Sequence, residues 1–151
     1  MSLVGKLVSE FEINAPAEKY YKMFKDQCFH IPNITSNHIK QVEVHEGDWD
    51  SHCHGSIKIW NYVMDGKVES FKERVEFDDE KLAVTLTGLE GDVFERYKAF
   101  KGTYQVVPKG ASHSLAIHTL EYEKLDDSTP YPYKYLDLMN CLTKDIESHL
   151  K

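Results

Sequence analysis

Four side chains of the types that bind zinc lie within ten residues of one another. They are His45, His52, Cys53 and His54. Imidazole and thiolate groups are the usual ligands of structural zinc, but such sites join pairs of ligands from separate parts of the chain. Here three of the four candidates are contiguous, and no second cluster with the required spacing accompanies them. The sequence therefore predicts no metal site, and a loop with incidental metal affinity is the better interpretation.

A second group of residues could transfer protons. His113 and His118, with Tyr97, Tyr104 and Tyr122, lie between residues 97 and 122. Histidine changes its charge near neutral pH, yet a histidine on a strand is more often packed or solvated than catalytic. The sequence contains no nucleophile elbow, phosphate-binding loop, dinucleotide fingerprint or zinc-protease motif. We expect no catalytic residue and no cofactor, and an enzyme remains the alternative hypothesis.

The elements that position these residues begin with a strand and two helices. Residues 6–13 alternate between apolar and charged side chains, which predicts a half-buried strand. Asn14-Ala15-Pro16 is a typical helix start, and a helix is predicted over about residues 16–26. Pro32-Asn33 interrupts this region, and a short second helix is predicted at residues 34–38.

Six further strands are predicted to follow as a meander. Alternation and turn residues place them at 39–46, 56–64, 67–77, 81–87, 94–107 and 112–124. Asp65-Gly66 is the strongest hairpin signal between them. Loops are predicted at residues 47–55 and 88–91, and Pro108-Lys109-Gly110 is predicted to end the fifth of these strands.

The tail of the chain predicts one long helix. Over about residues 130–149, Tyr135, Leu138, Met139 and Leu142 recur at spacings of three and four residues. A helix of that length runs about 30 Å, roughly the width of a small domain. Seven antiparallel strands coil strongly, and one helix across their concave face leaves room for a cavity. We therefore predict a single α+β domain over residues 1–151.

The composition disfavours several classes of partner. The formal net charge is −7 and no run of Lys and Arg stands out, which disfavours nucleic acids and anionic membrane surfaces. No apolar stretch approaches the length of a membrane span, and the N-terminus lacks the features of a signal peptide. Three widely spaced cysteines indicate reduced thiols and not a disulfide framework. We expect a cytoplasmic protein that does not insert into membranes.

Six short motifs resemble the major latex protein family of plants. They are residues 5–7 (Gly-Lys-Leu), 44–48 (Val-His-Glu-Gly-Asp), 55–62 (Gly-Ser-Ile-Lys-Ile-Trp-Asn-Tyr), 89–92 (Leu-Glu-Gly-Asp), 97–100 (Tyr-Lys-Ala-Phe) and 122–125 (Tyr-Glu-Lys-Leu). Together they span essentially the whole chain. The resemblance implies a helix-grip fold, in which a seven-stranded curved antiparallel sheet wraps around the long C-terminal helix and two short helices follow the first strand. It also implies a large hydrophobic cavity between the sheet and that helix.

The resemblance further implies which side chains line the cavity. They are Tyr20, Phe24, Lys58, Trp60, Tyr62, Phe71, Glu73, Leu82, Val84, Leu86, Tyr135, Leu138, Met139 and Leu142. The residues alone leave two alternatives open. The same apolar periodicity is typical of an ordinary packed core, and strand 56–64 could instead direct Ile57, Ile59 and Val63 inward. Lys58 and Glu73 are either polar contacts in an apolar pocket, an ion pair, or solvated.

The function implied by the resemblance is binding or transport of a small hydrophobic plant metabolite, lipid or hormone. An association with stress, defence or fruit ripening is implied in the same way. We expect a monomer or weak dimer. The alternative is an enzyme that uses the same cavity for condensation or isomerisation of a specialised metabolite.

Overall fold

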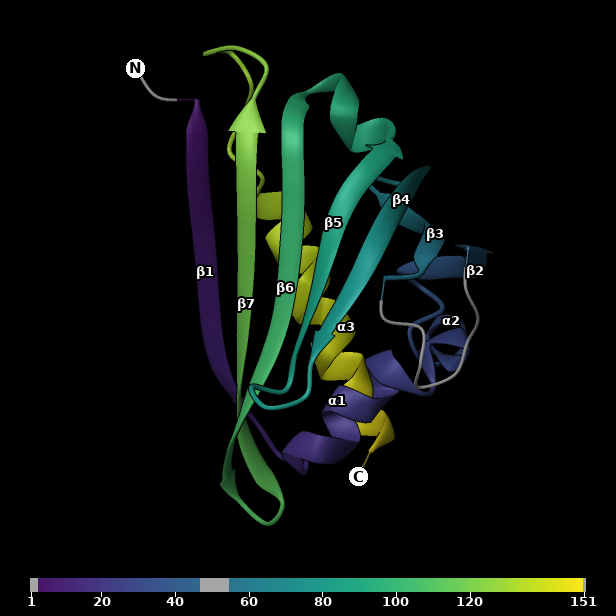
Figure 1. The fold of residues 1–151 in the computed structure, drawn as a ribbon, viewed down its shortest axis with the longest axis vertical. Coiled ribbons are helices and arrows are strands. Elements are labelled where there is room, and N and C mark those ends of the chain that lie inside the picture. The colour runs from purple at the N-terminus through teal and green to yellow at the C-terminus, as the bar shows by residue number, and fades with distance from the viewer. Residues whose placement is uncertain (1–2, 47–54, 151) are drawn as a thin grey trace.

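Seven antiparallel strands form one sheet that curves around a long C-terminal helix (Figure 1). The computed structural model describes residues 3–46 and 55–150. The strand order is β1-β7-β6-β5-β4-β3-β2, so the first and last strands pair with each other and the other neighbours are adjacent in sequence. This arrangement confirms the predicted α+β helix-grip fold.

The elements have the following bounds. The strands are β1 (Val4–Ile13), β2 (Ile39–Glu46), β3 (Ile57–Met64), β4 (Lys67–Asp78), β5 (Ala83–Gly91), β6 (Tyr97–Gly110) and β7 (His113–Lys124). The α-helices are α1 (Ala17–Lys25), α2 (Ile31–Ile34) and α3 (Tyr133–His149), with 3-10 turns η1 (Cys28–His30) and η2 (Asp92–Glu95).

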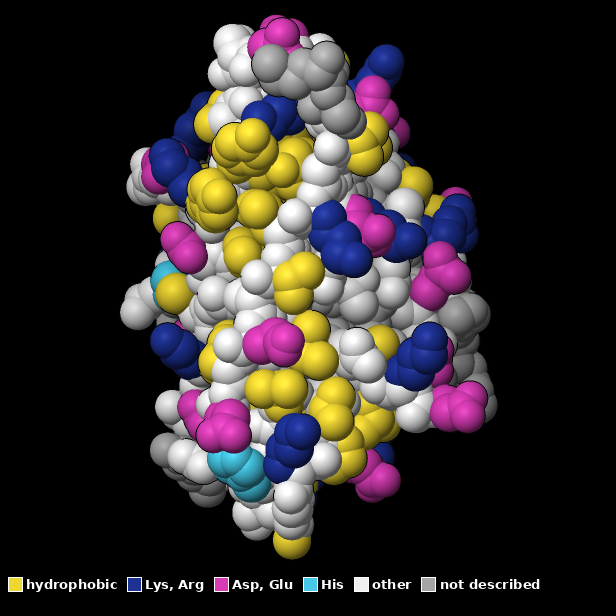
Figure 2. Space-filling model, turned by 90° about the vertical axis from the view of Figure 1, so that its left-hand side faces the viewer, with side chains coloured by type: hydrophobic (Ala, Val, Ile, Leu, Met, Phe, Trp, Pro, Cys, Tyr) yellow, Lys and Arg dark blue, Asp and Glu magenta, His cyan; other side chains and the backbone are white. Residues whose placement is uncertain are grey.

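Strand parity decides which side chains face α3. On β3 Lys58, Trp60 and Tyr62 of one parity are all buried, whereas of the other parity only Ile57 at the strand start is buried and Ile59 and Val63 are partly buried. This settles the alternative that the sequence left open, because pairing with β2 and β4 fixes the pleat of β3. At the far side of the sheet, edge strand β1 exposes Lys6, Glu10 and Glu12 together with Val4 and Val8. Figure 2 shows charged side chains of both signs among hydrophobic ones on this side of the molecule. Charged groups on an edge discourage pairing with the strand of another molecule.

The second helix lies earlier in the chain than predicted. It spans Ile31–Ile34, and the prediction of a helix at residues 34–38 is wrong. Pro32 stands in the first turn of α2, where its missing N–H costs no hydrogen bond. The proline therefore starts the helix instead of interrupting the region.

Strand β5 also differs from its prediction. It begins after Leu82, whose φ of 53° is left-handed, and continues to Gly91 where a loop was predicted. Both glycines in this stretch are required by close packing. A Cβ on Gly88 would lie 2.7 Å from the Phe94 ring, and one on Gly91 would meet the Ser70 carbonyl. These glycines allow close approach within the sheet, so they do not mark a loop.

Strand β6 is shifted toward the C-terminus by three residues at each end. It starts at Tyr97 because residues 92–95 form a 3-10 turn, and the Asp92 carboxylate accepts a hydrogen bond from the Ser70 N–H at 2.6 Å. It runs past Pro108, which pairs with Ser114 next to an irregularity at the strand end. A proline is tolerated at such a position, where a ladder hydrogen bond is not needed.

Candidate functional site

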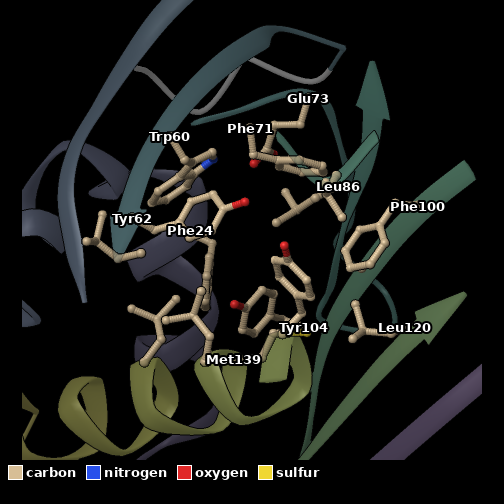
Figure 3. Close-up of a pocket in the computed structure, with 16 residues that line it drawn as sticks. Phe24, Trp60, Tyr62, Phe71, Glu73, Leu86, Phe100, Tyr104, Leu120 and Met139 are labelled. Atoms are coloured by element: carbon tan, nitrogen blue, oxygen red, sulfur yellow. The ribbon is translucent and has the colours of Figure 1, made fainter. Parts of the chain in front are cut away.

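A cavity lies between the concave face of the sheet, α1 and α3 (Figure 3). It offers about 90 Å³ for the centres of water-sized molecules. One water needs about 10–15 Å³ on this measure, so the space can take several waters or a small organic molecule. Well-packed protein interiors leave few voids larger than a water molecule. The cavity is therefore a notable departure from simple core packing.

Ten of the fourteen side chains predicted for the site lie in the cavity wall. They are Phe24, Trp60, Tyr62, Phe71, Glu73, Leu86, Tyr135, Leu138, Met139 and Leu142. They come from α1, β3, β4, β5 and α3, so the wall is assembled from segments far apart in the sequence. Their contact with a ligand stays a prediction.

The other four predicted residues lie outside the cavity wall. Tyr20 and Val84 are buried where α1 packs over β5 and β6, and that packing fills the space between the layers. The Lys58 ammonium is buried and donates a hydrogen bond to Ser56 Oγ at 3.0 Å. Leu82 is partly buried and packs against the core just before β5.

Six wall residues were not predicted from the sequence. They are Ile39, Val93, Phe100, Gly102, Tyr104 and Leu120. Phe100, Gly102 and Tyr104 share one parity of β6, a signal that was present in the sequence. Gly102 matters because it has no side chain, and a Cβ there would lie 3.6 Å from the nearest atoms of Leu120 and Met139. Val93 lies in a 3-10 turn, where no strand or helix period could identify it.

Among the described residues of the cavity wall, Glu73 is the one that carries a carboxyl group. Its side chain is fully buried, and neither of its oxygens has a hydrogen-bond partner among the described residues. Burial raises the pKa of the Glu73 carboxyl to about 8, and the opposing effects of the Lys58 charge and the Trp60 indole N–H are smaller. The group is therefore largely protonated at neutral pH.

The Trp60 indole faces the same part of the cavity. Figure 3 shows its nitrogen on the side of the ring turned toward Glu73. Trp60 Nε1 also has no hydrogen-bond partner in the part of the chain that the structure describes. The indole N–H thus approaches the carboxyl without completing a hydrogen bond. Together these two side chains form a polar end of a cavity whose wall also includes the tyrosines Tyr62, Tyr104 and Tyr135.

A second polar cluster joins the start of α3 to the sheet. The hydroxyls of Tyr62 and Tyr135 both donate to Glu69 Oε1, at 3.0 and 2.9 Å. Arg96 lies 4.0 Å from the other carboxylate oxygen. Burial is the main cause that raises the pKa values of both tyrosines, and the Glu69 carboxylate adds to it. Both hydroxyls therefore stay protonated and act as donors at neutral pH.

A third polar cluster, centred on His118, lies beneath α1 and α3. His118 Nε2 lies 2.8 Å from Thr143 Oγ1, and Nδ1 lies 2.7 Å from Asn140 Oδ1. Because an amide oxygen only accepts, the neutral ring must carry its proton on Nδ1 and accept from Thr143. Tyr20 then donates to Thr143 Oγ1 at 2.6 Å. Burial lowers the pKa of His118 to about 4, so this ring is neutral and structural.

Comparison with known proteins places this fold and cavity in a family. The model of the pathogenesis-related protein Bet v 1 family matches residues 2–151. The chain belongs to this family. MLP-like protein 43 and MLP-like protein 328 of Arabidopsis thaliana are 44% and 40% identical to this Bet v 1 family member, each over 99% of the chain and over 94% and 98% of their own lengths. Major latex protein 146 of Papaver somniferum is 38% identical over 98% of the chain and 92% of its own length.

Solved structures of other proteins agree with the fold. The crystal structure of ginseng major latex-like protein 151 from Panax ginseng superposes with a TM-score of 0.92, at 35% identity and over 98% of each chain. Norcoclaurine synthase from Thalictrum flavum superposes with a TM-score of 0.72 at 16% identity, over 99% of this chain and 90% of that one. The latter likeness shows a shared fold alone. Family and fold together support a ligand-binding protein with a hydrophobic cavity.

The remaining expectations concern metals and membranes. Within residues 3–46 and 55–150 of this Bet v 1 family member, no group of three metal-binding side chains is close enough to hold an ion. His52, Cys53 and His54 lie outside the described residues. No helix in the described chain is both long and apolar enough to cross a bilayer.

Proposed function

We propose that this protein binds and carries a small hydrophobic molecule in the cavity between the sheet and α3. The observation that carries the proposal is the cavity itself, with a wall of aromatic and aliphatic side chains and one polar end. Burying apolar ligand surface yields about 25 cal/mol per Å², so a ligand that buries about 200 Å² gains roughly 5 kcal/mol before the costs of association. A plant metabolite, lipid or hormone of matching size is the proposed ligand class.

The proposal also covers the physiological role, the compartment and the oligomeric state. The family resemblance supports a role in stress, defence or ripening. A carrier for a metabolite in solution fits a cytoplasmic monomer or weak dimer, with no nucleic-acid partner.

An enzyme is the second candidate, and one observation favours it. A buried carboxyl with a raised pKa in a cavity is a typical general acid. Acid–base chemistry also needs a second proton-transfer group held nearby, and the side chain turned toward Glu73 is the Trp60 indole, which does not titrate. Binding is therefore the function that the geometry supports better.

Native mass spectrometry with solvent extraction of the purified protein tests the proposal. We expect a stoichiometric apolar compound, or saturable binding of a fluorescent apolar probe such as 1-anilinonaphthalene-8-sulfonate. A compound found together with its chemically altered product would favour the enzyme.

A cavity-filling variant gives the matched control for this experiment. Gly102→Leu places a side chain into the cavity, because a Cβ at this position has room and points toward Met139. The neighbouring residue Thr103 has the opposite strand parity, so Thr103→Leu adds the same side chain on the other face of the sheet. Probe binding should be lost in the first variant and kept in the second. Equal binding by both folded variants would contradict the proposal.

A further inference from the structure

The polar end of the cavity has unmet hydrogen-bonding capacity. In the described chain, four buried side-chain atoms lack a hydrogen-bond partner, and three of them are Glu73 Oε1, Glu73 Oε2 and Trp60 Nε1. A buried polar atom without a partner is costly, and native proteins keep few of them. Three such atoms at one end of one cavity indicate a site that is completed by something other than the protein.

The neighbouring lysine does not complete it. The sequence left open an ion pair between Lys58 and Glu73, and in the sheet these two residues are cross-strand partners. The Lys58 ammonium donates instead to Ser56 Oγ at 3.0 Å, and both Glu73 oxygens stay without a hydrogen bond. The positive charge is therefore held next to the cavity while the carboxyl remains available inside it.

We propose that Glu73 and Trp60 select apolar ligands that carry a hydroxyl group, and that the hydroxyl binds between the carboxyl and the indole N–H. This inference rests on the proposed binding function. A hydroxyl has one donor and two acceptor sites. It can accept from the Trp60 N–H and donate to one Glu73 oxygen at the same time, so a single group pairs two of the three atoms and reaches both side chains.

Other functional groups match the site less well. An ammonium group has no acceptor for the indole N–H, and it would enter an apolar cavity beside the charge of Lys58. A ligand carboxylate has no donor for a Glu73 oxygen, and its negative charge would be buried in an apolar cavity. A pure hydrocarbon would leave three buried polar atoms unpaired.

The test compares two ligands that differ by one hydroxyl, naphthalene and 2-naphthol. Their affinities are measured by displacement of a fluorescent apolar probe from the wild-type chain and four variants. We expect the wild type to bind 2-naphthol at least about fivefold more tightly than naphthalene, as one or two buried hydrogen bonds require. Glu73→Met and Trp60→Phe should bring this ratio close to one, mainly through weaker binding of 2-naphthol.

Two variants separate hydrogen bonding from simple packing. Glu73→Gln keeps a donor and an acceptor at the same place, so the preference for 2-naphthol should persist. Phe71→Leu changes the apolar wall next to the site, so both affinities should fall and their ratio should stay the same.

The outcomes distinguish this inference from the function on which it rests. Equal binding of the two ligands by the wild type, or an unchanged ratio in Glu73→Met, would overturn hydroxyl selection and leave the carrier function standing. Tighter binding of 1-naphthylmethylamine than of 2-naphthol would also overturn it, in favour of a cation site. Failure of the wild type to bind any of these compounds or the probe would overturn both proposals.

Discussion

At the scale of single residues, Glu73 and His118 are buried titratable groups with opposite surroundings. Each ring nitrogen of His118 has a hydrogen-bond partner, and the ring forms edge-on contacts with the Tyr104 and Phe11 rings. Glu73 has no hydrogen-bond partner among the described residues. A satisfied buried network serves stability, whereas an unsatisfied buried group lowers it and is typical of functional sites.

The first prediction concerns how much stability the fold loses by burying the Glu73 carboxyl. Its carboxyl pKa is about 8 in the folded state against 4.5 in model compounds, so between these values the unfolded chain loses a proton that the folded chain keeps. The free energy of unfolding therefore falls as pH rises through this window. Glu73→Gln should remove this dependence on pH. Its free energy of unfolding relative to that of the wild type should therefore rise by about 3 kcal/mol between pH 4 and pH 7. Urea denaturation at several pH values measures this difference.

Glu76→Gln is the control for this measurement, because Glu76 lies on the same strand and is exposed. Its stability curve should run parallel to that of the wild type. If the Glu73→Gln curve does the same, the buried carboxyl does not titrate as described.

The second prediction concerns His118, whose shift has the opposite consequence. Its pKa is about 4 in the folded state against 6.5 in model compounds, so the unfolded chain gains a proton first as pH falls. Its contribution to stability is complete above about pH 6.5 and is lost toward pH 4, by about 3 kcal/mol in total. His118→Gln should flatten this acid limb, while His113→Gln, at a partly exposed site, should leave it in place. Denaturation curves from pH 7 to pH 4 decide between these outcomes.

At the scale of secondary-structure elements, Glu69 links the first turn of α3 to the sheet through hydrogen bonds. Tyr135 belongs to α3, Tyr62 to β3 and Glu69 to β4, and both tyrosines also line the cavity. The same carboxylate oxygen accepts from both hydroxyls. This cluster therefore couples the position of the helix to the wall of the cavity.

The third prediction follows from that coupling. Glu69→Ala leaves two largely buried hydroxyls without their acceptor, which should cost about 2–4 kcal/mol of unfolding free energy. Amide hydrogen exchange should also become faster in the first turns of α3 than in its last turns. Glu95→Ala, in the nearby η2 turn and away from these hydroxyls, is the comparison. Uniformly faster exchange along α3 would mean that Glu69 supports the fold as a whole and not this helix end.

At the scale of the whole molecule, the sheet curves around α3 (Figure 1). The cavity between them is space that the side chains do not fill. A ligand that occupies this space binds the folded chain and not the unfolded one. Its binding energy is then added to the stability of the fold.

The fourth prediction states the size of this effect. At a hundred times its Kd, 2-naphthol should stabilise the wild type by about 2.7 kcal/mol, which corresponds to a rise in Tm of roughly 5–10 °C. Gly102→Leu should show no such rise, because its added side chain occupies the cavity. Differential scanning calorimetry measures both, and an equal rise in the two proteins would place the binding elsewhere.

The sequence by itself determined the order of the elements, the long amphipathic helix and the family motifs, and so the helix-grip fold. The family resemblance, together with the alternation and helical spacing that report which face of an element is buried, also indicated ten of the sixteen described cavity-lining residues. Local periods could not tell that Gly88 and Gly91 continue a strand, since the reason is close contact with Phe94 and Ser70 from elsewhere in the chain.

Only the tertiary structure decided which buried faces are filled and which are left open. Tyr20 and Phe24 have the same helical signal, yet Tyr20 is hydrogen-bonded to Thr143 in the packed layer and Phe24 borders the cavity. The parity of β3 and the isolation of Glu73 were likewise set by neighbouring strands. Burial is a property of one element's pattern, whereas empty space and an unpartnered carboxyl depend on how several elements meet.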